Sequence, residues 1–348
     1  MRVLLTGAAG FIGSAVSDAL RSRGHEVVAV DVLLAQAHGR ARPSVDGVHR
    51  LDVRDAGEWG HLLRGVDVVC HQAAMVGAGI TVADMPSYAA NNDLGTATLL
   101  AVMAREGVRR LVLASSMVVY GEGRYACPDH GDQRPGPRAV EALDRGEFDH
   151  ACPRCGRALA WAAVDEEAPL DPRSSYAASK VAQEHYAAAW ARQAAGASIA
   201  LRYHNVYGPG MPRNTPYSGV AAIFRSAVEE GRAPDVFEDG RQMRDFVHVE
   251  DVARANLLAV EAVRDRPVGA QRAYNVASGR PVSILDVAQS LVRAAEGDLG
   301  PAVSGRYRSG DVRHVVASPA RARDELGFTA GIHPDAGIAA FSRAPLRD

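Results

Sequence analysis

The chain has 348 residues, of which 47% are hydrophobic and 23% charged, as is usual for a globular protein with a large core. Its formal net charge of −2 argues against nucleic acid or a membrane surface as the main partner. No apolar run approaches a membrane span, and the four cysteines are too unevenly placed for a disulfide framework. We therefore expect a cytoplasmic protein of one large or two modest domains.

The N-terminus predicts a dinucleotide-binding turn. A short apolar strand, Arg2–Thr6, leads into Gly7-Ala-Ala-Gly10-Phe-Ile-Gly13, and an apolar-periodic helix is expected over Ala9–Ser22. Gly7 permits the tight turn, Gly10 lets the backbone approach a pyrophosphate, and Gly13 lets the helix pack closely on the strand. The helix N-terminus then offers free N–H groups to the phosphates.

A second predicted strand, Glu26–Asp31, ends in an acid about twenty residues after the glycines. In that position, Asp31 accepts hydrogen bonds from the adenosine ribose and repels a 2′-phosphate, which favours NAD over NADP. Strand, glycines, helix, strand and terminal acid occur together. A purely structural glycine turn is therefore the weaker alternative.

Strands and helices alternate through the N-terminal half, which predicts an α/β fold built on a Rossmann-type, doubly wound parallel sheet. Further strands are expected at 48–51, 66–71, 111–115 and 199–203, and further helices at 92–106 and 176–193. Later helices near 219–230, 249–263, 283–295 and 319–326, with Gly/Pro-rich connections, indicate a smaller mixed C-terminal substrate-binding domain. We expect the NAD-binding domain at 1–205 and the mainly substrate-binding domain at 206–348, with part of 240–262 returning to the first.

Tyr176 and Lys180 lie four residues apart at the start of a predicted helix. At that spacing, both side chains leave one helical face, one turn apart. A neighbouring cation favours the ionised form of a phenol, so Tyr176 can take a proton from an alcohol. The alternative is a surface pair that merely shares a face, and the glycine loop upstream counts against it.

These features, in this order, resemble the extended short-chain dehydrogenases/reductases of the nucleotide-sugar epimerase and dehydratase group over nearly the whole chain. The resemblance is carried by Thr6–Gly13, Asp52-Val53, His71-Gln-Ala73-Ala74, Asn92-Asp-Leu-Gly-Thr96, Ser115-Ser116-Met117-Val118-Val-Tyr120-Gly, Tyr176–Lys180, Arg202-Tyr-His204-Asn205 and Arg244-Asp-Phe-Val-His248. It implies bound NAD, a nucleotide-sugar substrate and a homodimer formed through a helix pair of the Rossmann domain.

The resemblance also assigns the catalytic residues. In a 4-epimerase of this family, Tyr176 would take the proton of the sugar C4 hydroxyl while NAD takes the hydride. Ser116 would hydrogen-bond the same oxygen, and Lys180 would keep the phenol acidic and bind the nicotinamide ribose. For Ser116 the alternative is a serine that caps the turn after its strand.

Two sets of binding residues follow from the same resemblance. The NAD site is expected to contain Gly7, Gly10, Phe11, Ile12, Gly13, Asp31, Asp52, Val53, Ala73, Ala74, Asn92, Tyr176 and Lys180. Substrate contacts are expected from Ser116, Met117, Asn205, Arg213, Arg244 and Arg308, with Arg308 preferred over Arg306. The alternatives are a turn acid for Asp52, a core histidine for His71 and surface salt bridges for the arginines. The role of His204 stays open.

The residues after the active-site hydroxyl narrow the reaction. Dehydratases of the family carry an Asp-Glu pair where this chain has Met117 and Val118, which cannot act as acid or base. We therefore expect a 4-epimerase acting on a dTDP-6-deoxyhexose or on a UDP-hexose or uronate. A 4-ketoreductase that uses NAD(P)H and a catalytically silent NAD-binding regulator are the alternatives.

An insert at about 122–165 separates the Ser116 strand from the Tyr176 helix. It carries Cys127-Pro-Asp-His130 and Cys152-Pro-Arg-Cys155, two pairs with the spacing of a structural zinc site. His150 or Asp129 is the alternative to His130 as fourth ligand. A disulfide or free thiols are the alternatives to zinc.

With residues 214–224 and 237–242, this insert resembles the subgroup that contains dTDP-L-rhamnose 4-epimerases. Because it joins the two elements that carry the catalytic residues, we expect it to lie over the sugar as a specificity lid.

Overall fold

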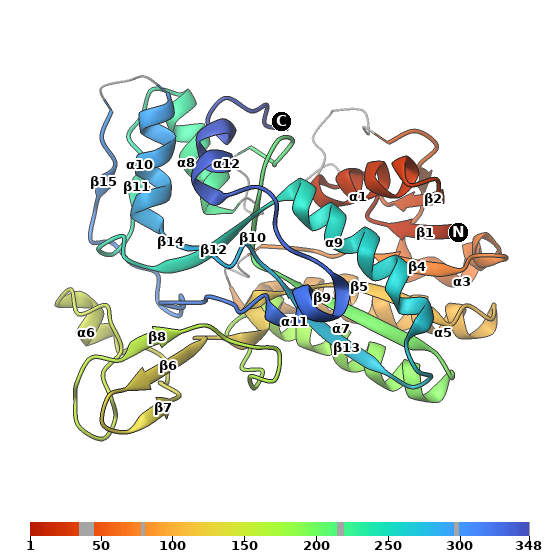
Figure 1. Ribbon diagram of the computed structural model, residues 1–348, viewed down its shortest axis with the longest axis horizontal. Helices are drawn as coiled ribbons and strands as arrows, with labels where there is room; N and C mark the ends of the chain where they lie inside the picture. Colours follow the sequence, from red (N-terminus) through yellow and green to blue (C-terminus); the bar gives the residue numbers. More distant parts are fainter. Residues whose placement is uncertain (35–44, 78–80, 214–218, 296–298, 348) are drawn as a thin grey trace.

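A computed structural model describes residues 1–34, 45–77, 81–213, 219–295 and 299–347. Its centre is a seven-stranded parallel sheet in the order β13-β9-β5-β4-β1-β2-β3 (Figure 1). The strands are β1 Arg2–Thr6, β2 Glu26–Asp31, β3 His49–Arg50, β4 Val68–His71, β5 Arg110–Ser116, β9 Ala197–Tyr203 and β13 Gln271–Val276. The order reverses between β1 and β4, where a doubly wound sheet opens its ligand crevice. The predicted fold class is confirmed.

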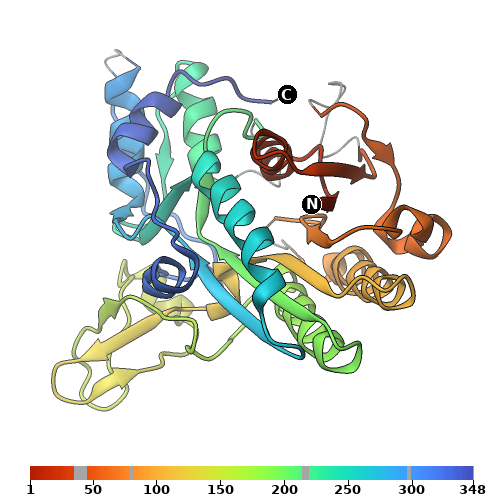
Figure 2. The same ribbon diagram turned by 45° about the vertical axis from the view of Figure 1, so that its right-hand side comes forward.

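Both faces of this sheet are covered by helices (Figure 2). Val3 and Leu5 of β1 join the core made with α1 (Phe11–Ser22), α9 (Val249–Ala262) and α11 (Ala320–Leu326). Leu4, between them, joins the opposite core, made with α3 (Ala56–Trp59), α5 (Gly95–Arg105) and α7 (Ser175–Gln193). Double burial explains why the central strands read as continuous apolar runs. Within the described ranges, no helix is long and apolar enough to cross a bilayer.

Three differences from the sequence prediction concern the central sheet and the helix α5. The helix expected at 92–106 begins earlier, because α4 (Met85–Tyr88) continues through a π-helical turn, Ala89–Leu94, into α5. The strand expected at 48–51 keeps only the two residues of β3. Strand β13 was not expected at all, because its Gln-Arg start is polar and only half-buried.

A second, smaller core lies beyond the carboxyl end of β9. Strands β10 (Asn205–Tyr207), β12 (Met243–His248) and β14 (Pro281–Ser283) pack with helices α8 (Val220–Glu229), α10 (Ile284–Ala294) and α12 (Pro334–Phe341). The pair β11 (Asp235–Val236) and β15 (Ala302–Val303) completes this region. Residues 214–218, which belong to the subgroup resemblance, lie outside the described residues.

The C-terminal segment returns to the glycine loop, a contact that the sequence did not suggest. Arg347 donates to the carbonyl of Ala9 at 2.7 Å, and its own carbonyl accepts from Arg213 N at 2.7 Å. The segment therefore ties the smaller region to the dinucleotide turn.

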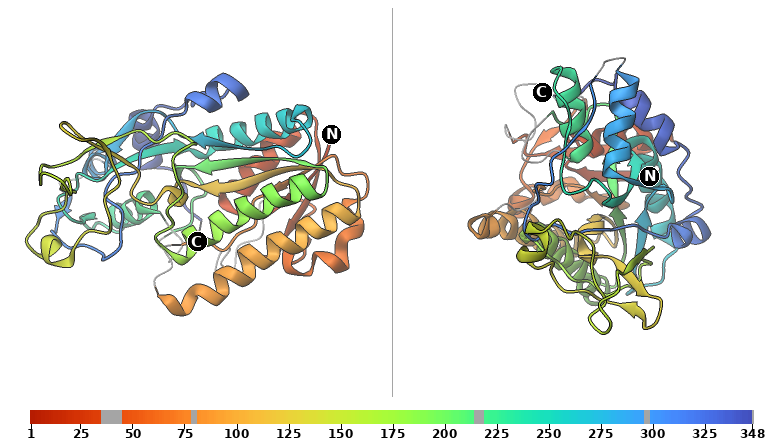
Figure 3. Two further views of the ribbon diagram at one scale, coloured as in Figure 1. Left: turned by 90° about the horizontal axis from the view of Figure 1, so that it is seen from below. Right: turned by 90° about the vertical axis from the view of Figure 1, so that its left-hand side faces the viewer.

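The insert forms a lobe of its own, at the lower left of Figure 1 and at the left of the first view in Figure 3. Its strands β7 (Gly131–Gln133), β6 (Arg124–Cys127) and β8 (Ala160–Ala162) are antiparallel, and α6 (Val140–Asp144) is its helix. Its core consists of Tyr125, Cys127, Cys152 and Leu159. So small a core cannot hold the lobe by itself, so its contacts with the rest of the chain matter.

Candidate active site

A cavity of about 1840 Å³ lies at the carboxyl ends of β1, β2, β4, β5 and β9. A single small ligand usually occupies about 300–1,000 Å³, so this cavity has room for two. Most predicted site residues line it: Gly7, Gly10, Phe11, Ile12, Gly13, Asp31, Asp52, Val53, Ala73, Ala74, Ser116, Met117, Tyr176, Lys180, Asn205 and Arg308. Asn92, Arg213 and Arg244 do not line it.

The glycine loop has the shape that a dinucleotide requires. Gly7 has a φ of +66°, and a Cβ there would lie 2.7 Å from Ala73 N. A Cβ on Gly13 would lie 1.9 Å from the carbonyl oxygen of Gly7, so any larger residue would push α1 away from the loop. The loop therefore presents bare backbone and the N-terminus of a 12-residue helix to the cavity, which suits a pyrophosphate.

Two acids border the far end of this loop. The carboxylate of Asp31 accepts from Ala9 N at 3.0 Å and Leu33 N at 2.8 Å, which fixes the turn at the cavity edge. Each carboxylate oxygen can accept more than one hydrogen bond, so the group is still suited to a ribose hydroxyl. Asp52 caps the turn Val53–Asp55 and pairs with Arg54, as the turn-acid alternative expected, and it also lines the cavity.

Ser116 and Tyr176 meet where β5 ends beside the start of α7. Ser174 caps α7 by accepting from Ala177 N at 3.1 Å, which places Tyr176 in the first turn. Ser116, the last residue of β5, lies beside the Tyr176 phenol, and both side chains line the cavity. The Ser116 hydroxyl accepts from Val118 N at 3.4 Å, so Ser116 also caps the turn after its strand, as the alternative expected.

Lys180 lies one turn further along α7 and is the only lysine in the sequence; the other 38 of its 39 Lys and Arg residues are arginines. Its Nζ is 5.9 Å from the Tyr176 ring centroid and donates to the carbonyl of Ala114 at 2.9 Å. Burial lowers the pKa of Lys180 to about 7, and Glu184 opposes this shift.

The pKa of the Tyr176 phenol is higher than the sequence led us to expect. Burial raises the pKa of Tyr176 to about 12, while the neighbouring Ser116 hydroxyl opposes the rise. The expected acidification by Lys180 is not seen, because the Lys180 amine is directed at a backbone carbonyl. Positive charge from a ligand is needed to make this phenol a stronger acid.

Two buried side chains support the site from behind. Asn92, in the π-helical turn, accepts from Met75 N at 2.7 Å and donates to Ser179 Oγ at 2.8 Å, which joins the cavity wall to α7. His71 hydrogen-bonds Thr6 at 2.7 Å and Thr96 at 3.0 Å, and burial lowers its pKa to about 3. His71 is thus a satisfied core histidine.

On the side opposite the glycine loop, Asn205, His204 and Arg308 face the cavity. Among the described residues, no group hydrogen-bonds Asn205 Oδ1 or either ring nitrogen of His204. Burial lowers the pKa of His204 to about 3, so the ring is neutral and can both donate and accept. The sequence offered no role for His204; its place after the strand that pairs with Ser116 is the signal for one.

Three other arginines are occupied elsewhere. Arg306 pairs with Asp235, whereas Arg308 lines the cavity. Arg213 pairs with Glu229. Arg244 donates to the carbonyls of Val312 and Arg313 at 2.7 Å each, so it supports the cavity wall and does not face the cavity.

The expected lid is wrong. All residues of 122–165 are described, and none of them lines the cavity. The insert instead packs behind the wall formed by residues 308–315, where Glu122 accepts from Arg313 N and Asp149 pairs with the Arg313 guanidinium, both at 2.8 Å.

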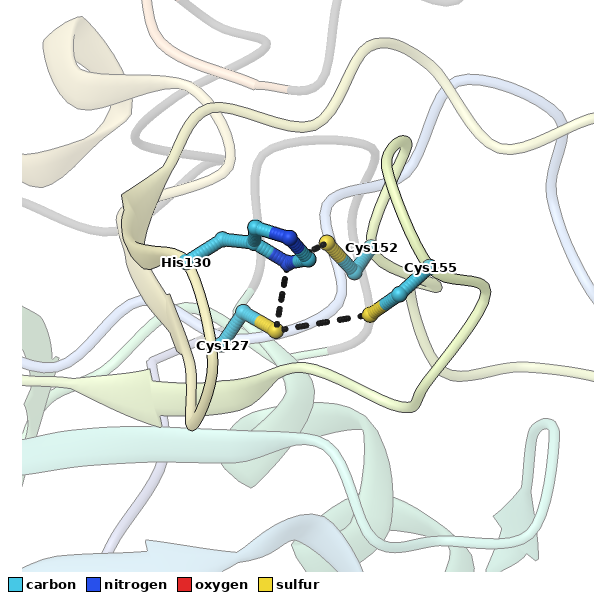
Figure 4. A group of neighbouring side chains, drawn as sticks. All are labelled: Cys127, His130, Cys152 and Cys155. Carbon is cyan, nitrogen blue, oxygen red and sulfur yellow. Dashed lines mark hydrogen bonds between the residues drawn. The ribbon is translucent and has the colours of Figure 1, made fainter.

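The predicted metal ligands do come together (Figure 4). Single ligand atoms of Cys127, His130, Cys152 and Cys155 all lie within 4.8 Å of one another. Nδ1 of His130 is 3.5 Å from Cys127 Sγ and 3.6 Å from Cys152 Sγ, and the sulfurs of Cys127 and Cys155 are 3.7 Å apart. The sulfurs are too far apart for a disulfide bond.

The alternative fourth ligands lie in other pairs. His150 is 3.1 Å from Glu122, and Asp129 is 3.0 Å from Arg157. His130 therefore completes the cluster.

A parallel sheet with a glycine loop and a Ser-Tyr-x-x-x-Lys group at one edge defines a dinucleotide-dependent enzyme of the short-chain dehydrogenase/reductase type. The chain belongs to the NAD dependent epimerase/dehydratase family, whose profile matches residues 3–142 and 156–277. The predicted family is confirmed. The unmatched residues 143–155 lie in the insert and include two of the four metal-ligand candidates.

Similar proteins include several 4-epimerases. The chain is 34% identical over 337 residues to dTDP-L-rhamnose 4-epimerase from Burkholderia thailandensis, covering 94% of this chain and 90% of that one. The solved UDP-glucose 4-epimerase of Thermus thermophilus, in complex with NAD, is 30% identical, with a TM-score of 0.76 over 98% of both chains. UDP-N-acetylglucosamine 4-epimerase from Methanobrevibacter ruminantium, in complex with UDP-N-acetylmuramic acid, is 26% identical, with a TM-score of 0.77 over 98% of this chain and 97% of that one.

Proposed function

We propose that this protein is an NAD-dependent 4-epimerase of nucleotide sugars. The observation that carries the proposal is the position of the Ser116–Tyr176 pair between the glycine loop and the wall that contains Arg308. The 4-epimerases to which the chain is similar support the same reaction. NAD, when bound, supplies a hydride acceptor and donor and brings positive charge next to Tyr176.

The roles of the protein groups follow from their positions. The glycine loop binds the pyrophosphate and Asp31 the adenosine ribose. Ser116 holds the sugar C4 oxygen by a hydrogen bond, and Tyr176 takes its proton and later returns it. The buried amine of Lys180 binds ribose hydroxyls on the cofactor side. Residues 206–348 contribute most of the substrate-binding side.

For the substrate, we favour a dTDP-6-deoxyhexose over a UDP-hexose or uronate, because of the 34% identity to a dTDP-L-rhamnose 4-epimerase. Arg308 binds the diphosphate, and Asn205 and His204 bind the sugar or diphosphate oxygens. Met117 and Val118 provide no acid or base, so dehydration is not part of the proposal.

Incubation of purified protein with a panel of dTDP- and UDP-sugars, without added cofactor, tests this function. An isomer of equal mass is expected. Conversion that occurs only when stoichiometric NAD(P)H is added would instead identify a ketoreductase. No conversion across the panel would favour a catalytically silent NAD-binding regulator.

We also propose that the insert binds a structural zinc ion. Tetrahedral zinc with bonds of about 2.3 Å to sulfur and about 2.0–2.1 Å to nitrogen places its ligands about 3.5–3.8 Å apart. The separations of 3.5, 3.6 and 3.7 Å in the cluster fit this range. About one zinc per chain in purified protein is expected by elemental analysis, and its loss in Cys152→Ser tests the ligand set.

A homodimer through α4–α5 and α7 is proposed for the assembly. On these neighbouring elements, visible together in the first view of Figure 3, Leu94 is 56%, Met85 49% and Tyr186 45% exposed, so a second copy of the chain would have several apolar side chains to cover. Light scattering of the wild type and of Leu94→Arg tests it. A cytoplasmic location stays a prediction from the sequence.

A further inference from the structure

We infer that the insert is a metal-fixed support for the cavity wall, so that metal occupancy sets the affinity for a nucleoside diphosphate but not for NAD. This inference rests on the zinc site proposed above and is independent of which reaction the enzyme catalyses. The wall is the segment 308–315, which contributes Arg308, Ser309, Gly310, Asp311, Val312 and Val315 to the cavity lining.

The insert holds the backbone of this wall from behind. Glu122 accepts from Arg313 N at 2.8 Å, and Tyr125 Oη accepts from His314 N at 3.0 Å. Both insert side chains are buried, at 6% and 0% exposure. A Cβ on Gly123 would lie 2.6 Å from the carbonyl oxygen of His314, so the two backbones touch. Displacement of the insert would therefore leave buried N–H groups of the wall without acceptors.

Arg138 of the insert makes a second link. Its guanidinium donates to the carbonyl of Asp311 and pairs with Glu238, both at 2.8 Å, and also donates to the carbonyl of Phe148 at 3.1 Å. The side chains of Arg138 and Glu238 are 4% and 3% exposed. One insert arginine thus fixes a cavity-lining residue, the smaller region and the insert itself.

Arg313 makes the third link, in the opposite direction. Its guanidinium is fully buried and lies 2.8 Å from carboxylates of Asp149, Glu238 and Asp239. Asp149 belongs to the insert, whereas the other two belong to the smaller region. Loss of Asp149 would remove one of the three counter-charges of this buried cation, so the insert helps to hold Arg313 in its place.

The metal ligands flank these contact residues in the sequence. Tyr125 lies two residues before Cys127, and Asp149 lies three residues before Cys152. Tyr125 packs in one small core with Cys127, Cys152 and Leu159. A core of four residues does not fix a lobe of this size, whereas four metal bonds do. The glycine loop follows β1 and Asp31 ends β2, and β4 separates these two strands from β5, the strand that leads toward the insert.

Calorimetric titrations of UDP, dTDP and NAD into untreated, chelator-treated and zinc-restored protein test the inference, with zinc content measured in each sample. Metal removal is expected to weaken binding of the preferred nucleoside diphosphate about tenfold or more, leave NAD binding within about twofold, and be reversed by zinc. Unchanged nucleoside diphosphate binding in zinc-free protein, or parallel loss of NAD binding, would overturn it. These titrations measure binding and not catalysis, so their result can be interpreted even if the protein is not an epimerase.

A pair of variants separates the link from the metal itself. Arg138→Gln cuts the contact with Asp311 and keeps all four metal ligands. Its control is Arg124→Gln on β6, because Arg124 is exposed and pairs at 2.9 Å with the exposed Asp132. Arg138→Gln is expected to retain zinc and NAD binding but to bind the nucleoside diphosphate about tenfold more weakly than Arg124→Gln. Equal nucleoside diphosphate affinity in the two variants would refute the supporting role of the insert.

Discussion

Replacing Tyr176 by Phe removes one oxygen atom and keeps the ring, whose centroid lies 6.0 Å from that of Tyr88. With the pKa of Tyr176 at about 12, ionisation at about pH 8 costs about 5 kcal/mol. A positive charge at about 4 Å can offset about 4 kcal/mol of this at an effective dielectric constant of about 20. The phenol can then exchange a proton with the sugar. We expect Tyr176→Phe to lower kcat by about 10³–10⁴-fold, or about 4–5.5 kcal/mol.

The assay is conversion of the nucleotide sugar to its isomer, with NAD affinity measured in parallel. In the wild type kcat should rise from about pH 7 to about pH 9, because the base works when deprotonated and the offset of about 4 kcal/mol leaves its pKa at the upper end of that range. The matched control is Tyr88→Phe, which removes a hydroxyl that donates to the carbonyl of Val76 at 3.3 Å. Its kcat should stay within about threefold. If Tyr176→Phe retained a kcat within about tenfold of the wild type, or matched Tyr88→Phe, the assignment of Tyr176 would be refuted.

Three further outcomes are expected. Asp31→Asn should weaken NAD binding about tenfold and reduce the preference of the protein for NAD over NADP, because the charged acceptor for the ribose hydroxyls is lost. An unchanged ratio of the NAD and NADP affinities in titrations of both cofactors would contradict this. In urea unfolding, the free energy of unfolding should rise between about pH 7 and pH 9.5, by up to about 1.36 kcal/mol per pH unit. The reason is that the unfolded chain keeps the Lys180 proton in this range, whereas the folded chain releases it near pH 7. The same slope in Lys180→Met would disprove this cause. Glu184→Gln should lower the free energy of unfolding by about 3–5 kcal/mol, because Arg202, buried and paired at 2.7 Å, loses its counter-charge; a loss below about 1 kcal/mol would count against it.

The dinucleotide half of the site was predictable because its features are local. Gly7 and Gly13 indicate a tight turn, because a side chain at either position would collide with residues close by in the chain or next to the adjoining strand. Tyr176 and Lys180 share a helix, so their spacing alone places them on one side of the cavity. The grouping of Cys127, His130, Cys152 and Cys155 was also predictable, because each half of it is a short turn with a fixed spacing of the two side chains.

The wall side was not predictable, because it depends on contacts between distant segments. Arg244 reaches carbonyls nearly seventy positions away, where the sequence pointed to phosphate. Arg138 and Arg313 appeared as ordinary charged residues, although each is buried among carboxylates from other elements. The position of the insert behind the wall follows from these pairs, and nothing in its own composition indicates it.

The single lysine also makes this chain a reporter of its own unfolding. A lysine-specific protease can cut the sequence at one peptide bond only, between Lys180 and Val181, to give residues 1–180 and 181–348. That bond lies inside α7, and the Lys180 side chain is 3% exposed, so the protease must wait until the helix leaves the sheet. The sequence has no other lysine that could compete for the protease. The rate at which the two fragments form therefore depends only on how fast, or how often, the core opens around α7.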